Sequence, residues 1–161
     1  MAQDRHATTL AWGVKQSFRS YVEAVGGAIE TAAGAERAAD GAFVFAPAPD
    51  STLALDAAGA LRGRGAFLGE VSFKAHGGML DVVMADPGLE IDDAGAALTV
   101  ADSARRTRRI EVARLDLSAM TTNEDGALVI PAAVTLDGYM LLGDHYPPRT
   151  PLDPVVLTLT P

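Results

Sequence analysis

From Gly41 onward the sequence alternates apolar and polar residues in short runs that turn-forming residues separate. Since successive side chains of a strand point to opposite faces, this alternation is typical of strands that bury one face. The expected strands are residues 8–12, 42–45, 52–55, 66–76, 79–85, 88–91, 97–100, 109–117, 127–136 and 154–160. The pattern therefore predicts a mainly β fold, either an antiparallel β-sandwich or a distorted barrel.

Four short segments rich in Asp, Asn and Gly predict the turns between these strands. They are residues 56–59, 86–88, 92–95 and 123–126, each placed so that the flanking strands pair as hairpins. The strand at 109–117 shifts its apolar phase, which predicts a bulge near Ala113 and Arg114. Residues 24–42 are rich in Ala and Gly and are expected to form a mobile excursion.

One convincing helix is predicted, at residues 14–25. Its apolar residues recur at helical spacing: Val14, Phe18, Val22 and Val25. Gly26 and Gly27 follow, and glycine readily adopts the left-handed conformation that ends a helix. Tyr21 lies at the edge of the apolar stripe, and Ser17 lies one turn earlier along the same edge. Two hydroxyl groups are therefore expected to border the apolar face of this short N-terminal helix.

Length and composition predict one globular domain, residues 1–161. Apolar residues make up 48% of the chain and charged residues 21%, with no apolar run of the length that spans a membrane. The net charge of -8 argues against a nucleic-acid partner, and the absence of cysteine excludes disulfides and thiolate metal sites. Without a secretory signal the chain is expected to be cytoplasmic if complete as written. Alternatively, it is an exported cell-envelope module with signal and anchor removed.

The segment FKAHGGMLD places a histidine and two glycines at the end of an expected strand. Alternation puts Phe73 on the core face and His76 on the opposite face. The glycines remove side chains there, which would admit a turn or let a flat ligand approach the backbone. Alone, neither Tyr21 nor His76 is specific, because core tyrosines and surface histidines are both common.

Other candidate residues carry weaker signals. His145 and Tyr146 precede a proline-rich segment and are either ligands or, for Tyr146, a packing anchor. The Arg105–Arg109 cluster would suit an anionic partner, although a solvated loop is the simpler interpretation. Asp92 and Asp93 are interpreted as turn formers rather than a catalytic pair. No glycine-rich phosphate loop, G-x-S-x-G or H-E-x-x-H motif is present, so the residues alone predict a small all-β binding domain.

Three longer segments carry a resemblance to a known family. They are LAWGVKQSFRSYV at 10–22, VSFKAHGGMLDVVMADPGLEI at 71–91 and HYPPRTPLDPVVLTL at 145–159. In this order, and over nearly the whole chain, they resemble the HtaA domain, the haem-binding module of actinobacterial haem-uptake proteins. The resemblance implies a mostly β fold with a short N-terminal helix that binds ferric haem b.

The resemblance also implies the residues of the site. Tyr21 would be the axial ligand of the iron, His76 would hydrogen-bond to it, and Ser17 would support the pocket. Phe18 would form an apolar wall, and Gly77 would leave room for the porphyrin. Phenolate oxygen is a hard donor suited to ferric iron, but free tyrosine has a pKa of about 10, so iron and a hydrogen-bond partner must assist. Further wall candidates are Val22, Met79 and Leu80, and cations near the site are Lys15, Arg19 and Lys74.

The resulting hypothesis is a non-enzymatic haem-binding module for capture, transfer or storage, with other haem-uptake proteins as partners in transfer. The second hypothesis is an enzyme that degrades haem or reacts with peroxide, which would need an acid/base residue such as His145. The third is a β-sandwich interaction module without haem, against which the retention of Ser17, Tyr21 and His76 argues. An exposed haem edge would also allow two modules to pair as a homodimer.

Overall fold

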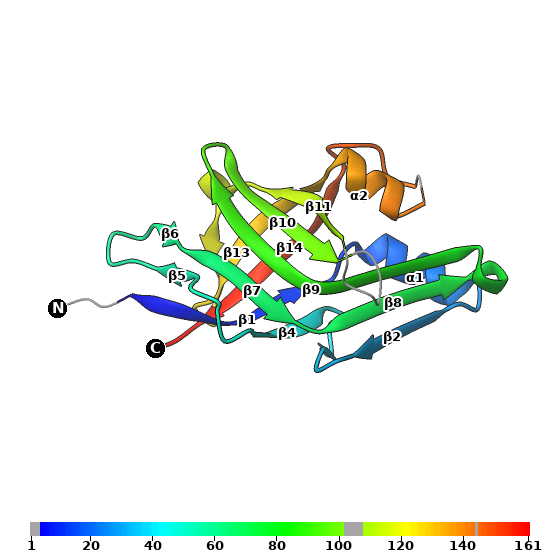
Figure 1. Cartoon of the computed structure of the whole chain (residues 1–161), viewed down its shortest axis with the longest axis horizontal. Coiled ribbons are helices and arrows are strands. Elements are labelled where there is room, and N and C mark those ends of the chain that lie inside the picture. The colour runs from blue at the N-terminus through cyan, green and yellow to red at the C-terminus, as the bar shows by residue number, and fades with distance from the viewer. Residues whose placement is uncertain (1–3, 102–107, 144) are drawn as a thin grey trace.

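The strands of the chain close into an antiparallel barrel (Figure 1). The computed structural model describes residues 4–101, 108–143 and 145–161. The barrel strands are β1 (Arg5–Trp12), β4 (Phe43–Pro47), β7 (Arg64–Leu68), β9 (Leu80–Asp92), β10 (Gly95–Ala101), β11 (Arg109–Leu115), β13 (Leu128–Val134) and β14 (Pro151–Leu159). Among these residues they pair in the order β4-β7-β9-β10-β11-β13-β14-β1, and β1 pairs with β4 to complete the ring. The mainly β prediction is confirmed, and the architecture is the barrel.

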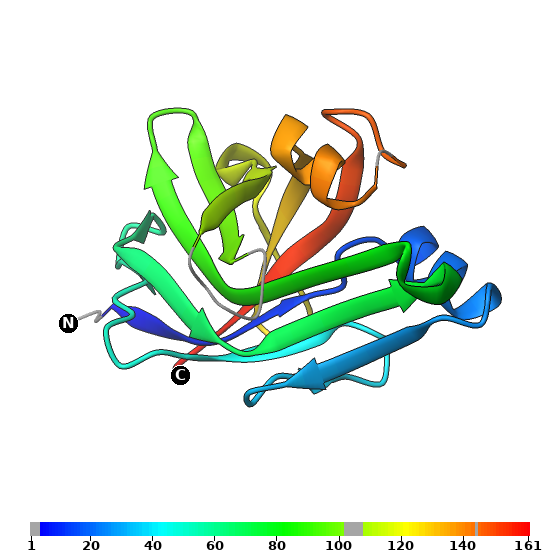
Figure 2. The ribbon, with the colours of Figure 1, turned by 45° about the vertical axis from the view of Figure 1, so that its right-hand side comes forward.

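A three-stranded extension projects from one end of the barrel. The first half of β9 pairs with β8 (Glu70–Ala75), and β8 pairs with β2 (Ala28–Ala32). Helix α1 (Gln16–Ala24) packs on this extension, and the turn His76–Gly78 joins β8 to β9 at its far tip. Figure 2 shows this tip on the right, together with the end of α1. The extension therefore brings the N-terminal helix and the H-G-G segment to the same place.

The remaining elements are short. They are β3 (Glu36–Arg37), β5 (Ala54–Leu55), β6 (Leu61–Arg62), β12 (Thr121–Thr122), α2 (Leu136–Leu141) and the one-turn 3-10 segment Leu117–Ala119. The predicted hairpins at residues 56–59, 92–95 and 123–126 are confirmed, because β5 pairs with β6, β9 with β10, and β12 with β13. In the part of the chain that is described, no helix is long and apolar enough to cross a membrane.

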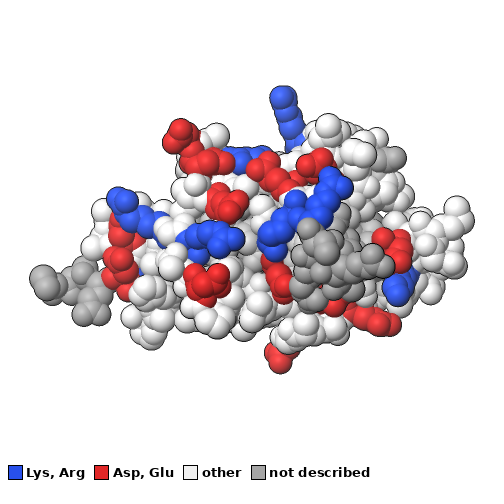
Figure 3. Space-filling view, in the orientation of Figure 1, with Lys and Arg blue, Asp and Glu red and all other residues white. Residues whose placement is uncertain are grey.

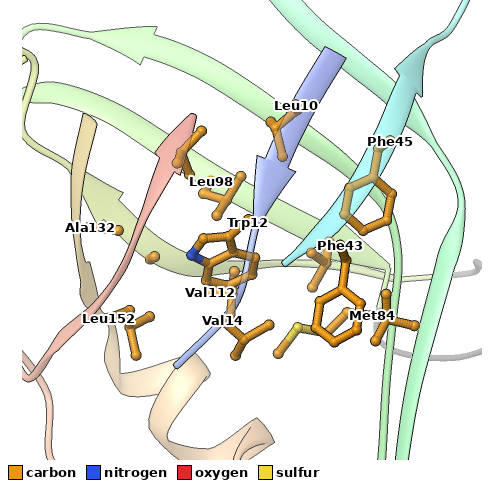
Figure 4. Close-up of a cluster of buried hydrophobic side chains, with 14 of the residues drawn as sticks. Leu10, Trp12, Val14, Phe43, Phe45, Met84, Leu98, Val112, Ala132 and Leu152 are labelled. Carbon is orange, nitrogen blue, oxygen red and sulfur yellow. The ribbon is translucent and has the colours of Figure 1, made fainter. Parts of the chain in front are cut away.

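Alternating strand residues fill the interior of the barrel, as the period-two pattern predicts. Figure 4 shows part of this core, with side chains from β1, β4, β9, β10, β11, β13 and β14 meeting inside. Phe43 and Leu98 are fully buried, and Trp12 is nearly so. The indole Nε1 of Trp12 donates a hydrogen bond to the Asp153 carbonyl at 2.8 Å. Full burial of a side chain such as Phe43 or Leu98 stabilises the fold by about 1.5–3 kcal/mol.

The hairpin predicted at residues 86–88 is wrong. Strand β9 runs without reversal through Asp86, Pro87 and Gly88 and changes partner there, from β8 to β7. Asp86 has φ 49°, and its amide donates to the Gly69 carbonyl at 2.7 Å. The turn-forming residues thus bend one long strand between barrel and extension instead of reversing the chain.

Two further predictions need adjustment, and a third is confirmed. Residues 24–42 are not an excursion, because they contain β2 and β3, which pair with β8 and β4. The helix at 14–25 is confirmed but begins at Gln16, and a second helix, α2, was not predicted. The bulge predicted near Ala113 and Arg114 does occur: Leu98 pairs with Ala113 and Thr99 with Glu111, which leaves Val112 as the additional residue.

The junction between β7 and β8 depends on Gly69. Its φ of 143° is a conformation that residues other than glycine rarely adopt, and a Cβ there would lie 2.7 Å from the Cβ of Ala35 and 2.8 Å from Phe45. We expect Gly69→Ala to lower the free energy of unfolding by about 2 kcal/mol or more, measured by urea denaturation.

Gly59 offers the matched control for this substitution. It has φ 84° in the β5–β6 turn, and no atom lies within 4 Å of the position of its Cβ. Gly59→Ala is expected to cost about 1 kcal/mol, from backbone strain alone. Equal losses in the two variants would contradict a role for crowding at Gly69.

Candidate functional site

Helix α1 is fixed at its N-terminal end by contacts that lie outside its own sequence pattern. Its N-cap residue, Lys15, makes no side-chain cap, and the Gln16 amide donates instead to Asp153 Oδ1 on β14 at 3.1 Å. Arg19, 8% exposed, donates to Asp153 Oδ2 at 2.6 Å and to the Gly13 carbonyl at 2.7 Å. One carboxylate thus anchors the first turn of the helix to the barrel.

The C-terminal end of α1 follows the predicted glycine stop. Gly26 has φ 76°, and the Gly27 amide donates to the Val22 carbonyl at 2.8 Å. The chain then enters β2, which pairs with β8. Phe18 packs its ring against Phe73 of β8, with centroids 5.1 Å apart. These contacts set the distance between α1 and the tip of the extension.

His76 lies just beyond β8, which ends at Ala75, so it is in a turn and not on a strand face as the alternation predicted. Its backbone has φ 55°, and Gly77 and Gly78 follow with φ 65° and 96°. A histidine in the left-handed region is uncommon, and such residues concentrate at functional sites. The turn lifts the imidazole out of the strand and toward α1.

The Tyr21 phenol and the His76 imidazole meet at this tip. Tyr21 Oη and His76 Nε2 share a hydrogen bond of 2.5 Å, and the two residues are 55 positions apart in the chain. Tyr21 is half-buried on α1, whereas His76 is exposed. The two residues that the sequence singled out as ligand and partner are therefore brought together, with the phenol oxygen on the open side.

Ser17 and Phe18 take different places in the site. Ser17 lies one turn before Tyr21, but its Oγ shares a hydrogen bond of 2.8 Å with the hydroxyl of Tyr146, not with Tyr21. Phe18 is 1% exposed and lies beneath the surface, with its ring centroid 6.3 Å from that of Tyr146. Ser17 is therefore a surface group of the site, and Phe18 supports it from the core. Their contact with a ligand stays a prediction.

Two residues that sequence reasoning left open, His145 and Tyr146, also belong to the site. The ring centroid of His145 lies 5.3 Å from that of Tyr21 and 6.4 Å from that of Phe18. Tyr146 packs on the core, as predicted, but its hydroxyl reaches Ser17. The sequence signal for both residues was the adjacent His145 and Tyr146 ahead of a proline-rich segment. That signal did not indicate which residues would lie beside them in the fold.

The surroundings of the phenol oxygen are open and partly apolar. A Cβ at Gly77 or Gly78 would meet no atom within 4 Å, so the turn leaves free space as predicted. Met79 is 91% exposed, which is unusual for a large apolar side chain. Val22 and Leu80, by contrast, are buried in the core. Met79 is thus the one of these three wall candidates that is available to a ligand at the surface.

The three cations suggested for the site differ in their availability to a ligand. Arg19 is buried against Asp153 and is not available to an external anion. Lys15 donates to the Pro151 carbonyl at 2.8 Å, and its Nζ lies 5.5 Å from the centre of the Tyr146 ring. Lys74 is exposed on β8. Lys15 is therefore the cation nearest to the hydroxyl pair of Ser17 and Tyr146.

The arginine cluster expected at residues 105–109 falls largely outside the described residues. Arg109 is described, and it is structural: its guanidinium donates to the Asp86 carbonyl at 2.7 Å and to Thr99 Oγ1 at 2.9 Å, and burial lowers its pKa. On the face in Figure 3 basic and acidic side chains alternate. Elsewhere in the described chain, Arg114 donates to both oxygens of Asp92 and lowers the pKa of that carboxyl.

The donor chemistry at the tip suits axial ligation of haem iron. Among the described residues there is no group of three or more His, Cys, Asp or Glu that could hold a metal ion. Iron already held by a porphyrin needs only axial ligation. A single phenol oxygen, hydrogen-bonded to an imidazole and facing open space, fits that requirement. Phenolate is a hard donor that matches ferric iron.

Comparison with known proteins places this geometry in context. The sequence model of the HtaA family matches residues 7–158, which is most of the chain. A comparison with curated proteins found no match.

Solved structures with the same fold come from Corynebacterium glutamicum. The C-terminal domain of HtaA is 24% identical with a TM-score of 0.71, over 98% of this chain and 99% of that one. The N-terminal domain gives the same identity and TM-score, over 100% and 99%. The haem-binding protein HtaB is 19% identical with a TM-score of 0.69, over 99% and 96%. At this level of identity the structures establish the shared barrel fold.

Proposed function

Because the chain belongs to the HtaA family, we propose that it binds ferric haem b, with the Tyr21 phenolate as axial ligand of the iron. The observation that carries the proposal is the 2.5 Å hydrogen bond between Tyr21 Oη and His76 Nε2 on an open part of the surface. The structural relative HtaB is a haem-binding protein, which supports the same ligand here.

His76 acts on the phenol oxygen in this proposal. When Tyr21 ligates iron its proton leaves, and the oxygen carries negative charge that a hydrogen bond from an imidazole N–H stabilises. A partner of this kind also fixes the orientation of the ligand. The left-handed backbone at His76–Gly78 supports this role, since it holds the imidazole beside α1 rather than in line with β8.

The open surroundings of the site favour the capture and transfer of haem over a reaction in an enclosed pocket. Gly77 and Gly78 leave room on one side of the phenol, and Met79 offers an exposed apolar surface to the macrocycle. A ligand held at an exposed site exchanges readily with another protein, and phenolate ligation keeps the iron ferric. We therefore assign a non-enzymatic role in which haem passes to or from other haem-uptake proteins.

A haem-using enzyme is the weaker candidate. It would need an acid/base residue facing the reacting side of the haem, and His145 was the spare histidine for that role. His145 instead packs against Tyr21, the proposed ligand. Loss of the haem absorption spectrum upon addition of a reductant would support degradation, whereas an intact spectrum supports the binding role.

Titration of a His76 variant with ferric haem tests the proposal. We expect His76→Asn to weaken binding by about 10–100-fold, the usual cost of losing the partner of a metal ligand. Asparagine suits the test because it tolerates the left-handed backbone at this position. The measurement is the dissociation constant from the change in the Soret band.

His6→Asn provides the matched control. His6 lies on β1, where it pairs with Ala54, away from the tip of the extension. The control variant is expected to bind ferric haem as the unmodified protein does. Equal affinities in His6→Asn and His76→Asn would contradict the assignment of His76.

A further inference from the structure

Two of the three histidines of the chain flank the same phenol. The His76 ring centroid lies 5.8 Å from that of Tyr21, and the His145 centroid lies 5.3 Å from it. The two imidazoles come from different parts of the fold, the tip of the extension and the connection between α2 and β14. An imidazole beside the proposed ligand is a further group that can donate to a metal.

The two imidazoles are not equivalent. His76 Nε2 is engaged by the Tyr21 hydroxyl. The His145 ring has no hydrogen-bond partner among the described residues, and its neighbours are the rings of Phe18, Tyr21 and Tyr146. The side chain is exposed, and the adjacent Gly143, with φ 74°, places no side chain against the ring. Within the described part of the chain, no hydrogen bond therefore competes with a metal for this imidazole.

Phenolate and imidazole suit different oxidation states of iron. Phenolate oxygen stabilises the ferric ion, while neutral imidazole nitrogen is the better donor to the ferrous ion. A site with both donors side by side can hold iron in either state. A site with phenolate alone holds ferrous iron weakly.

Resting on the proposed function, we propose that His145 is a second iron ligand of this site, used when the haem is ferrous. Tyr21 would hold ferric haem through its phenolate oxygen. After an external one-electron reductant has reduced the iron, Tyr21 would take up a proton from water as its oxygen leaves the iron, and His145 would supply a nitrogen lone pair in its place. The haem would then stay bound when it is reduced.

Resonance Raman spectroscopy of the haem-loaded protein, before and after anaerobic reduction with dithionite, tests this inference. The reduced protein is expected to show an iron–histidine stretching band. In His145→Phe, which keeps an aromatic ring in the cluster, that band is lost. Transfer of ferrous haem to apomyoglobin then becomes faster by about 10-fold or more, in line with the cost of removing a metal-site partner.

Three outcomes would overturn the inference, and they are distinguishable. An iron–histidine band that persists in His145→Phe but is lost in His76→Asn assigns the ferrous ligand to His76 instead. Absence of the band from the reduced, unmodified protein, with tyrosinate bands present in its ferric form, overturns the inference while leaving the proposed function intact. Failure of the unmodified protein to bind ferric haem overturns both.

Discussion

Tyr21→Phe is expected to raise the dissociation constant for ferric haem by more than about 100-fold. Loss of the partner of a ligand typically costs 10–100-fold, and loss of the ligand itself must exceed that. Phenylalanine keeps the ring that packs against His145, so the substitution removes the oxygen and little else. Titration of the purified variant, followed in the Soret region, gives the constant.

Tyr139→Phe is the matched control for this prediction. Tyr139 is half-buried on α2, and within the described residues neither the hydrogen bond nor the ring contacts of Tyr21 and His76 involve it. We expect the Tyr139→Phe variant to bind ferric haem with the same affinity as the unmodified protein. If Tyr21→Phe retained affinity within a few-fold of Tyr139→Phe, the phenol oxygen would not be the ligand.

Asp153→Ala is expected to cause the largest loss of stability, about 3 kcal/mol in the free energy of unfolding. The substitution leaves the buried Arg19 guanidinium without its carboxylate and removes the acceptor of the Gln16 amide. Removal of one partner from a buried ion pair typically costs 3–5 kcal/mol. The lower end applies because the Asp153 side chain is 28% exposed. Urea denaturation measures the change.

Glu90→Ala serves as its control at the protein surface. Glu90 pairs with Arg64 at 3.3 Å, and both side chains are more than half exposed. Such a pair contributes less than about 1 kcal/mol, so the variant is expected to unfold near the midpoint of the unmodified protein. A loss at Asp153 no larger than at Glu90 would show that α1 does not depend on this carboxylate.

The barrel could be predicted because its strands alternate cleanly. Strands β13 and β14 bury every second residue over most of their length, so periodicity alone identifies them and their faces. The bend in β9 could not be predicted in this way. Asp86, Pro87 and Gly88 are turn formers, and only the exchange of partner strands, from β8 to β7, makes them a kink. That exchange is a long-range property of the sheet.

The short elements α2 and β2 were not predicted, for a related reason. Helix α2 has six residues with a glycine among them, which is too short to display an apolar period. Its stabilising feature is local: Thr135 accepts a hydrogen bond from the Gly138 amide. Strand β2, with the sequence AIETA, is largely exposed and is stabilised by pairing with β8. The pairing with β8 leaves no pattern in the sequence of β2 itself.

The same distinction applies to the site, where some features could be predicted from the sequence and others could not. Tyr21 and His76 were identified from a family resemblance, and the fold brings their polar atoms into contact. The contact between Asp153 and α1 could not be predicted, because Asp153 lies on the last strand, far along the chain from the start of the helix. The place of His145 beside Tyr21 likewise depends on how the connection before β14 folds back over α1.

The identity of the atom that binds iron is the central claim, and resonance Raman spectroscopy of the protein loaded with ferric haem tests it most directly. We predict phenolate vibrations enhanced by a tyrosinate-to-iron charge-transfer band, present in the unmodified protein and lost in Tyr21→Phe. Persistence of those vibrations in Tyr21→Phe, or their absence from the unmodified haem complex, would contradict ligation by Tyr21.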